Sequence, residues 1–225
     1  MHLIKFIIFG IVLVYTALWS QANLFWSGLG QKKSPITIIQ NDDLRKLILN
    51  KTGIDIESIK ILESDKPFGM MVGIPTKPQL ILSRKLYDTF TPDEMEYVVL
   101  HEAGHYKLWH TITELTAGLI LLAVGILILR KVTALPLSLP MALLMGVVFG
   151  ILLIRVGRLN EYQADSYSLK HMTNPQGMIT ATNKFRAFYE DSYPKSKVIQ
   201  SLFYRGNPYD NRIKMAQAEI SARKN

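Results

Sequence analysis

The sequence contains no cysteine among its 225 residues. This absence excludes disulfide scaffolds, cysteine proteases and thiolate metal sites, so any metal must be bound by nitrogen and oxygen ligands. Acidic residues are also scarce, 18 against 26 basic residues, which gives a formal net charge of +8. The basic residues are scattered and form no clustered basic face, so we expect no nucleic-acid partner. This balance is typical of a membrane protein with basic flanks.

The most informative motif that is present reads HEAGH, from His101 to His105. Residues four apart lie on one face of a helix, so the two imidazoles can approach one ion. A catalytic zinc needs three protein ligands and an open position for water, and Glu102 is placed to accept a proton from that water. The pattern is short, and a surface helix that carries two histidines by accident is the alternative.

The residues before the motif predict a helix that holds it. Thr91-Pro92-Asp93-Glu94 reads as a capping box with proline at the first helical position. A helix from about 92 to about 110 places both histidines in its middle, where the backbone is stiff enough to hold ligand geometry.

The third ligand is expected downstream, in the ExxxD pattern of Glu161 and Asp165. On a helix these two carboxylates share a face, so Glu161 can bind zinc while Asp165 accepts the outer N–H of a ligating histidine. Two acids with this spacing also occur on solvated helix faces, which is the alternative. The remaining histidines, His2, His110 and His171, are poorer candidates because none lies in a supporting pattern.

Three hydrophobic segments approach the roughly 20 apolar residues that a membrane span requires. They are an N-terminal segment strongest at 6–19, a second at 115–129, and a third at 132–154 whose regular helix is expected to start near Leu139 because of Pro136 and Pro140. Gly146 and Gly150 form a small-xxx-small pair in the third segment, a pattern too common to predict a helix contact.

The second and third segments form a predicted helical hairpin between HEAGH and ExxxD. An antiparallel hairpin returns the chain to the side it left, which brings the two motifs together at one membrane face. The positive-inside rule predicts a cytosolic site in an integral protein of the plasma (inner) membrane. Residues 1–22 also resemble a signal peptide, and its cleavage would leave an outward-facing site.

Residues 34–90 read as a small α+β unit. Asn41 can cap a helix that closes at Gly53, and extended runs follow at 54–62, 68–74 and 79–82. We interpret the run Gly69, Met70, Met71 and Val72 as a sheet edge with which a substrate peptide can pair, the alternative being that the run belongs to the core.

In their order along the chain these motifs resemble the HtpX and CAAX prenyl protease group of integral-membrane zinc endopeptidases. The resemblance covers about residues 65–172. It implies one Zn²⁺ per chain bound by His101, His105 and Glu161, with Glu102 as the base. It also implies an α+β fold, mainly helical and zincin-like, with a small β-sheet. The three hydrophobic segments predict about three transmembrane helices, although members like HtpX tend to have two such segments before HEAGH where this chain has one.

The tail departs from the family pattern, because Asn207 stands where a histidine-proline pair would place its histidine. An asparagine amide can still donate a hydrogen bond to an oxyanion, and Arg212 can supply the charge or form a structural salt bridge. Both residues are therefore candidate catalytic residues.

The sequence thus predicts a membrane-bound zinc endopeptidase that acts on membrane-associated or misfolded polypeptides. Its predicted parts are an anchor (1–30), a soluble part with HExxH (31–112), the hairpin (113–155) and a helical part with ExxxD (156–225). A catalytically inactive binding or sensing module and a specialised prenyl-peptide protease are the rival functions.

Overall fold

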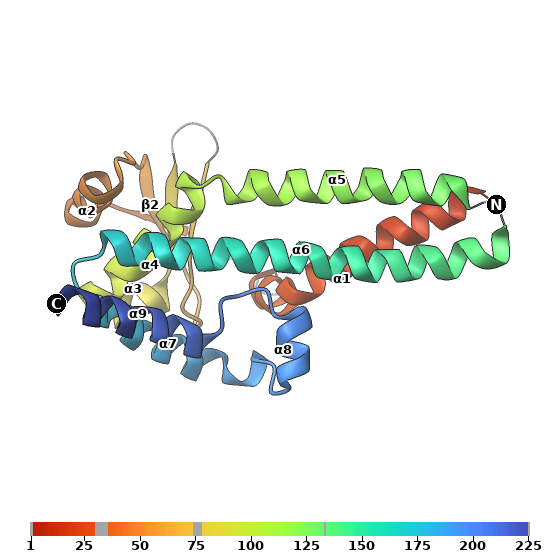
Figure 1. Cartoon of the computed structure of the whole chain (residues 1–225). Coiled ribbons are helices and arrows are strands. Elements are labelled where there is room, and N and C mark those ends of the chain that lie inside the picture. The colour runs from red at the N-terminus through yellow and green to blue at the C-terminus, as the bar shows by residue number, and fades with distance from the viewer. Residues whose placement is uncertain (1, 30–35, 74–77, 133, 225) are drawn as a thin grey trace. The chain divides into compact units, whose positions relative to one another are not determined.

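The computed structural model describes residues 2–29, 36–73, 78–132 and 134–224, and the chain divides into two compact units (Figure 1). We call residues 1–27, 110–159 and 194–206 the helical unit, and residues 28–109, 160–193 and 207–225 the sheet unit. Each unit therefore combines segments that are far apart in the sequence.

The described helices and strands follow in chain order. They are α1 (His2–Leu29), β1 (Ile36–Ile39), α2 (Asp42–Thr52), β2 (Ser58–Leu62), β3 (Gly69–Val72), β4 (Gln79–Ser83), α3 (Arg84–Thr89), α4 (Pro92–Lys107), α5 (His110–Lys131), α6 (Leu135–His171), α7 (Gln176–Tyr189), the 3₁₀ turn η1 (Glu190–Ser192), α8 (Lys197–Phe203) and α9 (Tyr209–Lys224).

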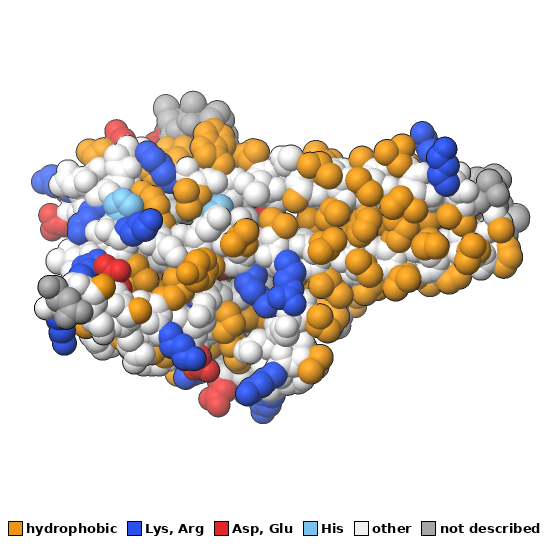
Figure 2. Space-filling view, viewed as in Figure 1, with side chains coloured by type: hydrophobic (Ala, Val, Ile, Leu, Met, Phe, Trp, Pro, Cys, Tyr) orange, Lys and Arg blue, Asp and Glu red, His pale blue; other side chains and the backbone are white. Residues whose placement is uncertain are grey.

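In the helical unit, α5 and the first part of α6 have the length and hydropathy of membrane spans. Much of their apolar surface is exposed, as Figure 2 shows by the hydrophobic side chains along both helices. Exposed leucines are unfavourable in water but suit contact with lipid. This surface supports insertion of the predicted hairpin into a bilayer.

The N-terminal helix α1 packs against both spans through glycines. A Cβ added to Gly125 of α5 would lie 2.1 Å from the Phe9 ring, and one added to Gly150 of α6 would lie 2.4 Å from Thr16 Cβ. Gly146 likewise faces Val12. The small-xxx-small pair of the third segment is therefore a helix contact, in which absent side chains let α1 approach closely.

The sheet unit contains a mixed sheet of four strands in the order β1-β2-β4-β3. Strands β2 and β4 are parallel, and the outer strands pair with them antiparallel. The central strands alternate buried and partly exposed residues, with Ile59 and Ile61 facing Leu80 and Leu82 in register. Their apolar side chains form one core with residues of α2, α3, α4, α7 and α9.

The residues predicted to begin and end the first helix of this unit do so in the structure. Asn41 Oδ1 accepts the Leu44 N–H at 3.0 Å at the start of α2, and Gly53 ends that helix with φ 71°. The mainly helical α+β class with a small sheet is confirmed. Strand β1 was not predicted, because its sequence shows no alternation of apolar and polar residues. In the structure three of its four residues are exposed.

Three predictions about helices need correction or stay open. The third hydrophobic helix begins at Leu135, not near Leu139, because Pro136 lies in its first turn and Pro140 removes only one early hydrogen bond. The expected helix 92–110 ends at Lys107, and Trp109 has φ 58° before α5 begins. Among the described residues, two helices are both long and apolar enough to span a membrane, and the apolar stretch described in α1 is Leu3–Thr16, so a third span remains a prediction.

Candidate metal centre

The HEAGH motif lies on α4, whose N-terminus is fixed by the predicted capping box. The Thr91 N–H donates to Glu94 Oε2 at 2.8 Å, and the Glu94 N–H donates to Thr91 Oγ1 at 3.4 Å. Nine residues of this helix are buried, so it crosses the core of the sheet unit. The two histidines are thus carried on a helix that cannot move independently of the core.

The ExxxD motif lies on the last part of α6, which approaches α4 closely at Gly104. A Cβ on Gly104 would lie 3.2 Å from the Ala164 Cα and 3.2 Å from Tyr167 Cβ. Because Gly104 directly precedes His105 and Ala164 directly precedes Asp165, this contact brings the two motifs together. A glycine is required there for packing and not for backbone conformation.

The three predicted metal ligands converge. His101 and His105 face each other with their Nε2 atoms 3.1 Å apart, and the Glu161 carboxylate oxygens lie 3.5 Å from each of these nitrogens. Tetrahedral ligands at about 2.1 Å from one zinc ion are separated by about 3.4 Å. The donor atoms, all within 4.8 Å of one another, therefore have the spacing and chemistry that fit a single zinc ion.

Asp165 lies behind the ligands as the predicted orienting carboxylate. It is fully buried, and its Oδ1 is 2.8 Å from His101 Nδ1, the ring nitrogen that faces away from the cluster. Such a contact favours the tautomer that presents Nε2 to a metal.

Tyr97 is a member of this network that the sequence reasoning missed. Its hydroxyl donates to Asp165 Oδ1 at 2.8 Å, and its ring lies 5.9 Å from the His101 ring. Burial, together with the negative charge of Asp165, raises the pKa of Tyr97 well above its usual value, so the hydroxyl stays a donor. The available signal was its position four residues before His101, on the same helical face.

Asn207 and Arg212 contact the carboxylates of the ExxxD motif. Asn207 is 2 % exposed and donates its amide to Asp165 Oδ2 at 2.7 Å. Arg212 on α9 donates from Nε to Asp165 Oδ2 at 2.9 Å and from a terminal nitrogen to Glu161 Oε2 at 3.1 Å. The structure thus brings both predicted residues to the site, on the side of the carboxylates.

The electrostatics of this cluster favour a cation between the ligands. Burial alone would lower the pKa of His101, but Asp165 and Glu161 overcome it and raise the pKa to about 10. Burial would raise the pKa of Glu161, yet hydrogen bonding to His101 and the charges of His105 and Arg212 hold it well below its ordinary value. The carboxylates therefore remain ionised.

Glu102 projects from α4 beside the cluster and next to β3. Burial raises the pKa of Glu102 to about 7, although the charge of His101 and a hydrogen bond from the Met71 N–H act in the opposite direction. Gly69 allows this approach, since a Cβ there would lie 3.0 Å from Val98 and 3.5 Å from Glu102 Cγ. A carboxyl with this pKa exchanges protons near neutral pH.

Strand β3 is an edge of the sheet, because among the described strands it pairs only with β4. The Ser83 N–H donates to the Phe68 carbonyl at 2.9 Å, so by alternation the backbone groups of Gly69 and Met71 point away from β4. The side chains of Met70 and Val72 are exposed, 42 % and 36 % respectively. The predicted substrate-binding run therefore presents backbone groups next to Glu102.

The other histidines lie outside the described donor cluster. His110 is buried at the start of α5, and His171 stacks on Tyr167 at the end of α6, with 4.2 Å between ring centroids. The side chain of His2 lies outside the described residues.

Comparison with known proteins decides the family. The model of peptidase family M48 matches residues 41–220, which is most of the chain. The chain belongs to this family. The match confirms the resemblance to the HtpX and CAAX prenyl protease group, and M48 is a family of metallopeptidases whose members generally use zinc.

The M48 fold is also seen in a solved relative. The crystal structure of Ste24p from S. mikatae matches 93 % of this chain with a TM-score of 0.64 at 15 % sequence identity. The chain covers 57 % of the length of Ste24p, so the likeness concerns the fold. A comparison with curated proteins gives no significant match.

Proposed function

We propose that this M48 protein is a zinc-dependent endopeptidase whose metal is bound by His101, His105 and Glu161. The observation that carries the proposal is the convergence of the two Nε2 atoms and the Glu161 carboxylate within 4.8 Å. A bound zinc ion would act as a Lewis acid that polarises the scissile carbonyl and acidifies water. The two imidazoles and one carboxylate form the set that leaves one position open in catalytic sites.

Glu102 moves the proton in this mechanism. Its pKa of about 7 lets the carboxylate accept a proton from the attacking water and, as the acid, return it to the leaving amine. The Met71 N–H holds the carboxylate toward the edge of β3. A substrate strand paired with that edge would therefore present its scissile bond beside the base.

Asn207 and Arg212 were both candidates for direct stabilisation of the reaction. Their contacts favour an indirect role in the reaction, because the Asn207 amide already donates to Asp165 and Arg212 already bridges Asp165 and Glu161. We assign both to positioning: they keep the two carboxylates ionised and aligned, and Asp165 in turn orients His101. Of the two residues, Arg212 is the more accessible to a substrate, because it is only partly buried.

The substrates are proposed to be unfolded or membrane-associated polypeptides. The exposed apolar surface of α5 and α6 supports a site tethered to the bilayer, and an edge strand recognises backbone in preference to particular side chains. Recognition of this kind suits substrates that expose extended segments.

We further propose that α1 is a retained third span and that the active site is cytosolic in a plasma-membrane protein. The packing of Phe9, Val12 and Thr16 into glycine positions of α5 and α6 supports retention, because a cleaved signal peptide has no need for such contacts. The mass of the purified protein and the protease accessibility of a C-terminal tag in sealed vesicles test these two points. A mature chain lacking residues 1–22 would contradict retention.

The peptidase activity is tested with the variant Glu102→Gln. We expect wild type and variant to bind one zinc per chain, while cleavage of casein falls at least about 100-fold in the variant. Glu219→Gln, the same chemical change in a partly exposed ion pair on α9, serves as a control and should cleave normally. Equal cleavage by the wild type and Glu102→Gln would remove Glu102 from the mechanism and favour the inactive-module alternative.

A comparison of substrates separates the remaining alternative. A specialised prenyl-peptide protease would cleave a farnesylated peptide far faster than its unmodified form, whereas the proposed enzyme should cleave both at comparable rates.

A further inference from the structure

Helix α8 is hydrogen-bonded to α6 at residues that directly follow the apolar run of α6. Arg158 donates from Nε to the Tyr204 carbonyl at 3.0 Å and from a terminal nitrogen to the Gln200 carbonyl at 2.6 Å. One turn earlier on α6, Arg155 donates to Ser201 Oγ at 3.4 Å. These bonds fix the C-terminal end of α8 next to the last apolar turn of α6, and α8 crosses the direction of α6 (Figure 1).

The outer side of α8 is apolar and uncovered. Val198 is 68 % exposed and Ile199 is 51 % exposed, the most exposed aliphatic residues outside the long helices apart from those of β1. Leu202 and Phe203 follow four residues later, so these side chains share one face of the helix. On α6, Leu152 is also exposed, at 44 %.

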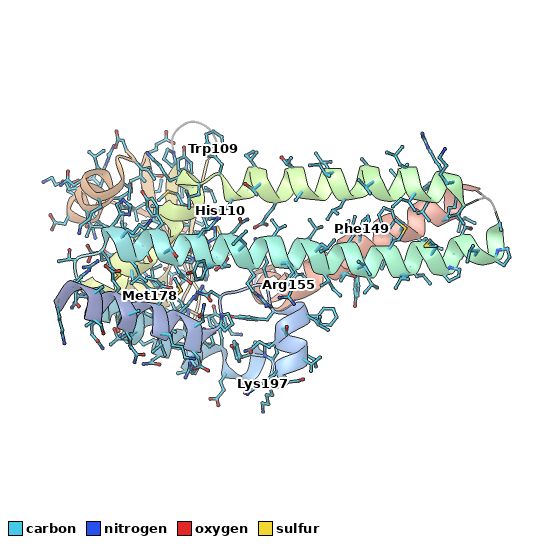
Figure 3. All side chains as sticks on the ribbon, in the orientation of Figure 1. Trp109, His110, Phe149, Arg155, Met178 and Lys197 are labelled. Atoms are coloured by element: carbon cyan, nitrogen blue, oxygen red, sulfur yellow. The ribbon has the colours of Figure 1, made fainter. Side chains whose placement is uncertain are left out.

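Basic side chains surround this apolar face. Lys195, Lys197 and Arg155 are exposed, with Arg155 located between α6 and α8 and Lys197 at the end of α8 away from α6 (Figure 3). The sequence of the helical unit contains a single acidic residue, Glu114, which pairs with Arg205. The helical unit therefore carries an excess of positive charge, to which the basic residues beside α8 contribute.

We propose that α8, with Lys195, Lys197 and Arg155, binds the anionic surface of a lipid bilayer. A helix that lies across a span, with apolar residues on one side and lysines beside them, has the features of an interfacial helix. Val198 and Ile199 insert at the level of the headgroups, and the basic residues contact their phosphates. The inference rests on the proposed insertion of α5 and α6.

The cysteine-free sequence allows a direct test with single-cysteine variants carrying an environment-sensitive fluorophore. Val198→Cys and Ile199→Cys probe α8, Leu144→Cys probes the apolar run of α6, and Leu49→Cys on the polar helix α2 is the aqueous reference. Each full-length protein is reconstituted in phosphatidylcholine vesicles, with and without phosphatidylglycerol, that contain lipids bearing a nitroxide at a shallow or a deep acyl position.

We expect the Val198 and Ile199 probes to be quenched more by the shallow nitroxide, the Leu144 probe more by the deep one, and the Leu49 probe by neither. Phosphatidylglycerol should increase shallow quenching at Val198. The double substitution Lys195→Gln with Lys197→Gln should lower the apparent association constant for phosphatidylglycerol by about fivefold for each lysine.

Quenching at Val198 and Ile199 no greater than at Leu49, with Leu144 still quenched, would overturn the inference and leave the spans intact. Absence of quenching at Leu144 would instead overturn membrane insertion itself. Quenching at Val198 that does not depend on phosphatidylglycerol would overturn the headgroup contact. Oxidative dimerisation through Val198→Cys without quenching would show that a second copy covers this face.

Discussion

The Asn207 side-chain amide donates to Asp165 Oδ2 at 2.7 Å, and Asp165 Oδ1 lies 2.8 Å from the outer nitrogen of His101. Asn207 is therefore linked through one buried carboxylate to a predicted metal ligand. At this tail position the family pattern has a histidine, and here a neutral amide fills the place. Arg212, which contacts the same oxygen, supplies the positive charge.

Substitution Asn207→Ala should weaken zinc binding. Loss of the amide leaves Asp165 one donor short and frees it to rotate, and loss of such an outer contact lowers metal affinity by about 10–100-fold. Competition with a chromogenic chelator measures this affinity. Asn50→Ala, at an exposed position of α2, should bind zinc as the wild type does. Unchanged affinity in Asn207→Ala would show that Asn207 does not position the site.

Tyr97→Phe removes one hydroxyl and nothing else from the same network. We expect a loss of about 1 kcal/mol in the free energy of unfolding, typical of one hydrogen bond, and a measurable decrease in zinc affinity. A purely structural role would lower stability alone. The exposed tyrosine Tyr162 on α6 offers a matched control, because Tyr162→Phe should change neither quantity.

The close approach at Gly104 gives a separate prediction about helix packing. A leucine at this position must push Ala164 away, since a Cβ already lies 3.2 Å from its Cα. The displacement would separate Glu161 from His105 and destabilise the fold by about 1–3 kcal/mol. Zinc content and thermal unfolding in detergent measure the two effects. Ala218→Leu on the exposed face of α9 is the control, and equal behaviour of both variants would contradict the prediction.

The motifs and caps on α4 could be predicted because they depend on residues within one or two helical turns. Thr91 with Glu94, and His101 with His105, are pairs of this kind. The third ligand required a spacing known from its family, and Glu161 meets that requirement. Arg212 was a candidate from the tail pattern, and Tyr97 lies one turn before His101. Their contacts with Asp165 could not be read from the sequence, because Asp165 lies on a different helix. The same reason explains why Gly150 was not recognised as a contact.

The ion pair of buried Glu94 and partly exposed Lys184 predicts how the free energy of unfolding depends on pH. Glu94 is 2 % exposed, and its Oε2 lies 2.6 Å from Lys184 Nζ. Burial would raise the pKa of Glu94, but the hydrogen bonds from Lys184 and from the Thr91 N–H lower it below the ordinary 4.5. Because the folded state holds its proton more weakly than the unfolded state, Glu94 stabilises the fold above pH 4.5.

This stabilisation should be lost as the pH falls from 4.5 through the lowered pKa of Glu94. Glu94→Gln should be less stable than the wild type by about 1–3 kcal/mol at pH 7 and should approach the wild type in acid. Thermal unfolding in detergent at both pH values measures the difference. A difference that stays constant with pH would show that Glu94 is not the group responsible, and Glu219→Gln provides the exposed control.

Gly150 and Gly118 make a matched pair for testing whether α1 belongs to the mature protein. A Cβ on Gly150 would lie 2.4 Å from Thr16 Cβ, whereas the nearest atom to a Cβ on Gly118 is 4.0 Å away. If α1 is retained, Gly150→Ala should lower the thermal unfolding temperature in detergent, and Gly118→Ala should not. If residues 1–22 are removed by cleavage, Thr16 is absent and both alanines should be tolerated equally. The difference between these two variants therefore reports on the third span without any assumption about zinc or activity.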